Sequence, residues 1–142
     1  SVICLDMDFP AFMRQAGQQG VDIVLSGAID GTPSSEGNPL HSVMASYRTI
    51  ESGFSLARGG FYAQTVAVDY QGHGLGKMDY YTASDRTLVA QLPIKGTPTL
   101  YLVLGDFFPY LCVIGLLSLI GTAVVRKQLA ARSRRQLSIA VN

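Results

Sequence analysis

The stretch VICLDMDFP, residues 2–10, places a short apolar run directly before a helix signal. The run predicts a strand that ends at Cys4, so this cysteine occupies a strand-to-helix corner. A thiol at such a corner is close to the positive end of a helix and to free backbone N–H groups, which favour the nucleophilic thiolate. Asp6 and Asp8 oppose a further negative charge, so an active thiolate needs a cation and a base from elsewhere in the fold. A buried structural cysteine is the alternative that this stretch leaves open.

Length and charge distribution bound the organisation of the chain. Its 142 residues, of which 48% are hydrophobic, are enough for one domain with its own core. Because the chain starts with Ser1 directly before a strand, and not with Met, we interpret it as the C-terminal part of a longer protein. Residues 1–106 carry ten acidic and six basic residues, whereas residues 126–142 carry five basic residues and no acidic one. The two ends are therefore expected to face different surroundings.

Helix and strand signals alternate after the corner. Asp8 is the expected cap of a helix that has Pro10 in its first turn. The apolar face of this helix is expected to contain Phe9, Phe12, Met13 and Ala16. Residues 21–29, VDIVLSGAI, form a nearly continuous apolar run that predicts a strand covered on both faces and parallel to the first. Residues 30–39 then predict a loop at a strand end, where α/β folds bind their ligands.

The second half of the domain repeats these signals. Asn38 and Pro39 predict the start of a second helix. Its apolar face is expected to contain Leu40, Val43, Met44, Tyr47, Ile50 and Phe54. Further strands are predicted in residues 54–59, in a hairpin over residues 64–76 with glycine at positive φ in the turn, and in residues 87–94.

Residues 107–125 form an uncharged run of nineteen residues, which as a helix spans roughly 28 Å. The run predicts one transmembrane helix, because the rest of the chain is too small to surround a buried core helix of this length. Cys112 lies within it, so we expect no disulfide with Cys4. Five basic residues follow the run at Arg126, Lys127, Arg132, Arg134 and Arg135. They place the tail in the cytoplasm and the Cys4 domain on the outer side, with anionic lipid rather than nucleic acid as the partner of the tail.

Several motifs occur in a defined order along the chain. Cys4 with an acidic residue two places on precedes the strand of residues 21–29, the helix ending in RTIESGFSLAR (48–58), and the hairpin VDYQGHGLG (68–76). This order resembles the carbon–nitrogen hydrolase (nitrilase) superfamily, and the C-terminal span and basic tail are most similar to its bacterial apolipoprotein N-acyltransferase family. The resemblance covers residues 1–130. It implies an α/β fold that is part of an α-β-β-α sandwich, followed by one transmembrane helix.

The resemblance also implies roles for individual residues. Cys4 matches the nucleophile that forms a thioester with the acyl group, the N–H of Leu5 would help to hold the oxyanion, and the Glu base and Lys of the family belong upstream. Further candidates for lining the site are Asp6, Asp30, Glu51 and Arg58, of which the last two fit an ion pair on a helix end equally well. The chain departs from the family in Asp6, where a Glu is usual, in residues 27–31, where an Asn-Asp-x-Trp loop is usual, and in having no tryptophan.

Taken together, the sequence predicts four segments: a catalytic portion at residues 1–98, a connector at 99–106, a transmembrane helix at 107–125 and a basic cytoplasmic tail at 126–142. The expected function in the bacterial inner membrane is transfer of a fatty acyl group from a phospholipid, through a Cys4 thioester, to the N-terminal amine of a lipoprotein. The alternatives are a membrane-tethered amidase and a non-catalytic binding module. His41 and His73 are weaker candidates for pairing with Cys4, and neither a metal nor a cofactor is expected.

Overall fold

A computed structural model of the chain describes residues 1–32 and 39–140, and the side chains of these residues up to position 128. The chain divides into two compact units, Ser1–Gly105 and Asp106–Asn142. The expected cap Asn38 lies outside the described residues.

The first unit is built on a five-stranded mixed sheet in the order β1-β2-β3-β4-β5. Its strands are β1 (Val2–Ile3), β2 (Ile23–Ile29), β3 (Ser55–Phe61), β4 (Gln64–Val68) and β5 (Gly74–Asp79). The first three strands are parallel and the last two are added antiparallel, which confirms the predicted parallel pair and the predicted hairpin. Gly72 has the positive φ, +86°, that the turn of this hairpin was expected to need.

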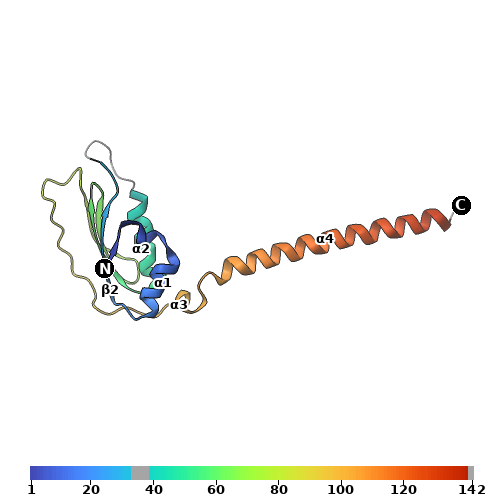
Figure 1. The fold of residues 1–142 in the computed structure, drawn as a ribbon, viewed down its shortest axis with the longest axis horizontal. Helices are drawn as coiled ribbons and strands as arrows, with labels where there is room; N and C mark the ends of the chain where they lie inside the picture. The colour runs from blue at the N-terminus through green and yellow to red at the C-terminus, as the bar shows by residue number, and fades with distance from the viewer. Residues whose placement is uncertain (33–38, 141–142) are drawn as a thin grey trace. The chain divides into compact units, whose positions relative to one another are not determined.

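Helices cover one face of this sheet. The connections are a 3₁₀ helix η1 (Cys4–Asp8), the helix α1 (Pro10–Gln18) and the helix α2 (Pro39–Ser52). Both α-helices lie on the same side of the strands (Figure 1), as expected when successive right-handed crossovers step in one direction across a sheet. The core between helices and sheet consists of Met7, Met13, Val24, Ala45, Phe54 and Leu56.

Strand β2 is covered on one face and not on both, which corrects the expectation from its apolar run. Val24, Ser26 and Ala28 are buried under the helices, whereas Leu25 and Ile29 are 59% and 65% exposed. Alternate side chains of a strand point to opposite faces, so half of this run points away from the helices. From the sequence alone, a strand with one exposed apolar face therefore looks the same as a strand that is covered on both faces.

The buried face of α2 is also not the predicted one. Its buried residues are Ser42, Ala45, Arg48, Thr49 and Ser52, and the predicted apolar residues Leu40, Val43, Tyr47 and Ile50 are about half exposed. Small side chains allow the helix to approach the sheet closely, and Ser42 Oγ donates a hydrogen bond to the Gln64 carbonyl of β4 at 3.1 Å. Polar anchoring to the sheet thus sets the rotation of α2 against its own apolar stripe. Phe54 is fully buried, as predicted, but it lies beyond the end of the helix.

The N-cap of helix α1 lies one residue later than predicted. Its N-cap is Phe9, with no side-chain cap, so Asp8 does not cap it, while Pro10 occupies the first turn as expected. Of the predicted apolar face, Met13 is buried, whereas Phe9 and Phe12 are 62% and 48% exposed. A single core position therefore anchors this short helix.

Residues 87–94 do not form the predicted strand. They run along the open face of the sheet, where Leu88, Ala90 and Leu92 share a small cavity with Ala57 and Ala67. A segment that crosses a sheet face cannot join the ladder of hydrogen bonds at a sheet edge, although alternate apolar residues, Leu88, Ala90 and Leu92, are partly covered there while Val89 and Ile94 are exposed.

Two helices complete the chain: α3 (Leu100–Leu104) in the first unit and α4 (Phe107–Ala140) in the second. Within α4, residues Phe107–Gln128 form a 22-residue stretch that is long and apolar enough to cross a membrane, and no part of it is buried. This agrees with the single apolar C-terminal helix predicted from the sequence. Both Cys4 and Cys112 are free.

Candidate active site

Cys4 begins the 3₁₀ helix η1 directly after β1, at the predicted corner. Its φ is +46°, a left-handed conformation that costs a non-glycine residue roughly 1–2 kcal/mol. The corner is held on both sides: Met7 is buried in the core, and the Asp6 carboxylate accepts a hydrogen bond from the Ile3 N–H at 2.9 Å. Asp6 thus caps the turn that presents the thiol.

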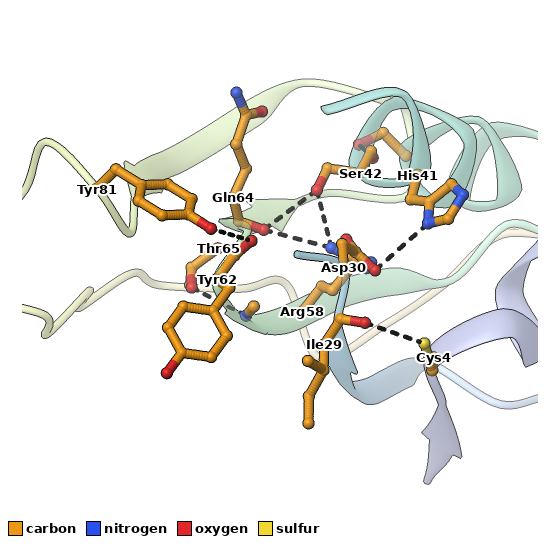
Figure 2. A network of polar contacts seen from close by, with 12 residues as sticks. Cys4, Ile29, Asp30, His41, Ser42, Arg58, Tyr62, Gln64, Thr65 and Tyr81 are labelled. Atoms are coloured by element: carbon orange, nitrogen blue, oxygen red, sulfur yellow. Dashed lines mark hydrogen bonds and ion pairs between the residues drawn. The ribbon is translucent and has the colours of Figure 1, made fainter. Parts of the chain in front are cut away.

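The thiol points to the end of the neighbouring strand. Cys4 Sγ is 3.8 Å from the carbonyl oxygen of Ile29, the last residue of β2 (Figure 2). Because β1 and β2 are parallel, with Ile3 opposite Gly27, the carboxyl ends of both strands lie at the same end of the sheet. Asp30 follows Ile29 at this end of the strand, where the sequence predicts a ligand-binding loop, and its role in lining the site stays a prediction.

A buried ion pair fixes this edge from the helix side of the sheet. The Asp30 carboxylate is 1% exposed and lies 2.6 Å from the Arg58 guanidinium, which is 2% exposed. Arg58 also donates to Ser42 Oγ at 2.8 Å, and His41 Nδ1 lies 3.3 Å from the other Asp30 oxygen. Figure 2 shows these groups converging from three different elements. The network ties the end of β2 to β3 and to the start of α2. It thereby positions the Ile29 carbonyl, which accepts the hydrogen bond from the Cys4 thiol.

A cavity opens beside Cys4 on the face of the sheet that the helices leave uncovered. It has a volume of about 880 Å³, a size typical of ligand sites. Its lining includes Ile3, Cys4, Gly27, Ile29, Gly59, Phe61, Met78, Tyr80, Arg86 and Leu88. Gly27 and Gly59 are paired neighbours in the sheet, and a Cβ on either would meet nothing within 4 Å. Because glycine has no side chain, the backbone at these two positions forms the floor of the cavity.

Aromatic side chains and one cation form the far wall of this cavity. Phe61 and Tyr80 contact edge to face with ring centroids 5.2 Å apart, and the Arg86 guanidinium lies 4.0 Å above the Tyr80 ring. Arg86 is the charged side chain among the described residues of the lining, and no salt bridge to it is found in the described part of the chain. Cation–π contact orients it without neutralising its charge. Sequence reasoning did not single out Arg86, because its link to Tyr80 and to the cavity is tertiary.

No protein-family model matches the chain. Over 110 residues, 74% of its length, it is 31% identical to the apolipoprotein N-acyltransferase of Chlamydia caviae. The chain belongs to the carbon–nitrogen hydrolase (nitrilase) superfamily. It spans 20% of the length of this acyltransferase.

Solved structures from the same superfamily are also similar to the chain. An amidase from Nesterenkonia sp. is 22% identical, covering 56% of this chain and 33% of its own, with a TM-score of 0.47. A mutant of that amidase in complex with butyramide is 21% identical, with the same coverage and TM-score.

The remaining predicted site residues of this carbon–nitrogen hydrolase chain lie in different places. Glu51 pairs with Arg48 at 2.5 Å near the end of α2, which leads into the start of β3, the sheet end opposite Cys4. Arg58 makes its ion pair with Asp30 instead. Leu5 follows Cys4 within η1, and the oxyanion role of its N–H stays a prediction. His73 pairs with Asp69 in the hairpin turn, and among the described residues no group of three His, Cys, Asp or Glu side chains could hold a metal.

Proposed function

We propose that the chain provides the nucleophile of a membrane-bound acyltransferase that moves a fatty acyl group from a phospholipid to the N-terminal amine of a lipoprotein. The observation that carries this proposal is the position of the Cys4 thiol, on a strained corner at the mouth of an apolar cavity of about 880 Å³. Homology to apolipoprotein N-acyltransferase supports the choice of an acyl group over a small amide.

Two acyl transfers through Cys4 make up the proposed reaction. The Cys4 thiolate attacks the ester carbonyl of the donor, the C–O bond breaks, and the lysophospholipid alkoxide takes the proton that the thiol gave up. The acceptor amine then attacks the thioester, the C–S bond breaks, the proton lost by the amine passes to the base, and the thiolate returns as an amide forms. Backbone N–H groups at the corner, including that of Leu5, would stabilise the oxyanion of each tetrahedral intermediate.

The base and the cation for Cys4 are proposed to come from an upstream part of the same polypeptide. In the described part of the chain, the hydrogen bond found for the thiol is to the Ile29 carbonyl, and no Glu or Lys is found bonded to it. Asp6 and Asp8 follow Cys4 closely and are acidic, so neither of them supplies the cation that accompanies the nucleophile in the superfamily. The Glu and Lys of the superfamily would meet this need.

The cavity and α4 together suit a lipid donor. Apolar lining accepts an acyl chain, and Arg86 at the far wall, for which no salt bridge is found among the described residues, would pair with the phosphodiester of the donor. A membrane helix on the same chain raises the local concentration of phospholipid at the site.

Trapping of the thioester tests the proposal. In the full-length protein mixed with phospholipid vesicles, mass spectrometry is expected to find a fatty acyl adduct on the Cys4 peptide, and addition of a lipoprotein-like N-terminal amine should discharge it. Cys4→Ala should lose the adduct and reduce transfer to background, with membrane insertion unchanged because the volume change is small. Undiminished acyl transfer by the Cys4→Ala variant would rule out Cys4 as the nucleophile. An adduct that is lost to water at the same rate with and without amine would identify an amidase instead.

The role of Arg86 is testable by changing the donor. Arg86→Gln should raise KM for phospholipid donors about tenfold, since a charge-assisted hydrogen bond contributes roughly 1.5–3 kcal/mol, and should leave an uncharged thioester donor unaffected. Arg86→Lys keeps the charge and is the matched control, expected to retain part of the affinity. Equal losses with charged and uncharged donors would contradict a phosphate contact.

A further inference from the structure

The short helix α3 exposes an apolar face. Leu100, Val103 and Leu104 are 73%, 76% and 48% exposed, and their spacing places them on one side of the helix. Leu102 points the other way: a Cβ on Gly17 of α1 would lie 2.6 Å from its Cδ2 atom. The helix therefore docks through its inner side and leaves an outer apolar face, which we define as Leu100, Val103 and Leu104.

Hydrogen bonds hold α3 firmly against the first unit. The Arg14 guanidinium donates to the Leu102 carbonyl at 2.8 and 3.1 Å and to the Val103 carbonyl at 2.9 Å, and Gln18 donates to the Leu102 carbonyl at 2.9 Å. These carbonyls belong to the last turn of a helix, where intrahelical partners are absent. At the other end, Thr99 Oγ1 donates to the Glu51 carbonyl. The outer face of α3 thus has a fixed direction on the first unit.

The chain itself limits how far α3 can be from the apolar helix α4. Only Gly105 and Asp106 separate Leu104 from Phe107. The Cα atoms of Leu104 and Phe107 are therefore at most about 11 Å apart. The interfacial layer on each side of a bilayer is roughly 5–8 Å thick. Tyr110, 70% exposed in the first turn of α4, is a residue type enriched in that layer. If α4 crosses a bilayer from Phe107, the end of α3 is therefore beside or within the interface.

We infer that the outer face of α3 is a lipid-docking surface that sits in the interfacial layer, with its three side chains among the outermost acyl carbons. No charged residue lies within α3 to oppose this. The inference rests on the membrane insertion of α4 in the proposed function, and is independent of the acyl-transfer chemistry. It adds a second membrane contact, which fixes the orientation of the first unit and not only its attachment.

Tryptophan fluorescence tests this surface directly, because the chain contains no tryptophan of its own. Three variants of the full chain are reconstituted into vesicles with lipids brominated either near the headgroup or deep in the acyl chain. Val103→Trp probes α3, and Leu116→Trp probes the middle of the candidate span. Val43→Trp is the matched control, since Val43 is also an exposed apolar helix residue, 46% exposed, but lies on α2 near the Cys4 end of the sheet.

The outcomes are distinct. The inference expects Val103→Trp to lose most of its emission to lipids brominated near the headgroup, Leu116→Trp to lose it to deeply brominated lipids, and Val43→Trp to keep its emission in both. Quenching of Leu116→Trp without quenching of Val103→Trp overturns the inference and leaves α4 in the membrane. Emission of Val103→Trp that resists both the lipids and an aqueous quencher shows a protein partner and overturns it too. An unquenched Leu116→Trp removes the membrane placement of the proposed function along with the inference.

Discussion

At the scale of the residue, the corner at Cys4 combines three constraints in a few positions. The positive φ turns the chain sharply between β1 and η1, the Asp6 carboxylate caps the turn through the Ile3 N–H, and Met7 fastens it to the core. Strain of this kind persists where surrounding structure holds it, and functional sites are where it is usually found. Here the strained residue is Cys4, which lines the cavity on the open face of the sheet.

The strain predicts an unusual order of stabilities at position 4. Cys4→Gly should be about 1 kcal/mol more stable than Cys4→Ala, because glycine adopts the left-handed conformation without the steric cost of a Cβ. Urea unfolding of both variants in detergent measures the difference. At Leu5, which has no positive φ, the order should reverse, with the glycine variant roughly 0.5–1 kcal/mol less stable than the alanine variant. The same order at both positions would contradict strain at Cys4.

At the scale of the element, the β4–β5 hairpin is closed by a side chain that acts on its own turn. The Asp69 carboxylate accepts hydrogen bonds from the Gln71 and His73 N–H groups at 2.9 and 2.8 Å, and the His73 ring lies 3.0 Å from its second oxygen. Burial raises the pKa of Asp69, but these hydrogen bonds and the nearby imidazole outweigh it, so the pKa lies below its ordinary value of 3.8. The folded turn therefore favours the ionised carboxylate.

A pH-dependent stability follows from this lowered pKa. The contribution of Asp69 is fully present above its ordinary, unfolded pKa of 3.8 and is lost as the pH falls through the lower folded pKa. Asp69→Asn keeps an oxygen for the turn but does not ionise. The stability advantage of the wild type over Asp69→Asn, measured by urea unfolding, should thus shrink below about pH 4. Asp69→Ala should lose about 1 kcal/mol at neutral pH, and an advantage that grows on acidification would refute the assigned shift.

At the scale of the whole molecule, the charges divide between the two units. The chain from residue 1 to 106 is acidic, and all five basic residues beyond residue 125 follow the uncharged run of residues 107–125. Within the first unit, α3 is bonded to the ends of α1 and α2, and Cys4 lies at the opposite end of β2. A seven-residue strand is about 23 Å long, so α3 and the Cys4 thiol lie at opposite ends of the first unit.

The charge division predicts the topology. By the positive-inside rule, a reporter fused after Asn142 should be active only on the cytoplasmic side, with Cys4 accessible from outside to a membrane-impermeant thiol reagent. Replacing Arg126, Lys127, Arg132, Arg134 and Arg135 by glutamine should weaken this preference. Activity of the reporter only outside the membrane would reverse the orientation and the compartment proposed for Cys4.

Patterns that repeat within a few residues determined much of this protein from its sequence. The strand-to-helix corner at Cys4, the parallel β1–β2 pair, the β4–β5 hairpin with its glycine turn, and the apolar α4 helix all follow from local periodicity, turn residues and run length. Each of these signals depends on the backbone conformation of adjacent residues, which the sequence specifies directly. The placement of Cys4 and Asp30 at one edge of the sheet follows in turn from the parallel order of the strands.

Only the tertiary structure decided which side of each element is buried and which side chains meet. The rotation of α2 depends on the bonds of Ser42 to Gln64 and Arg58, the partner of Arg58 is Asp30 and not Glu51, and residues 87–94 cover a sheet face instead of joining its edge. Arg86 reaches the Cys4 cavity through the same kind of long-range contact. Hydrophobic burial has no direction, so an apolar stripe shows that a residue can be buried but not against what; close packing and the pairing of buried polar groups make that choice.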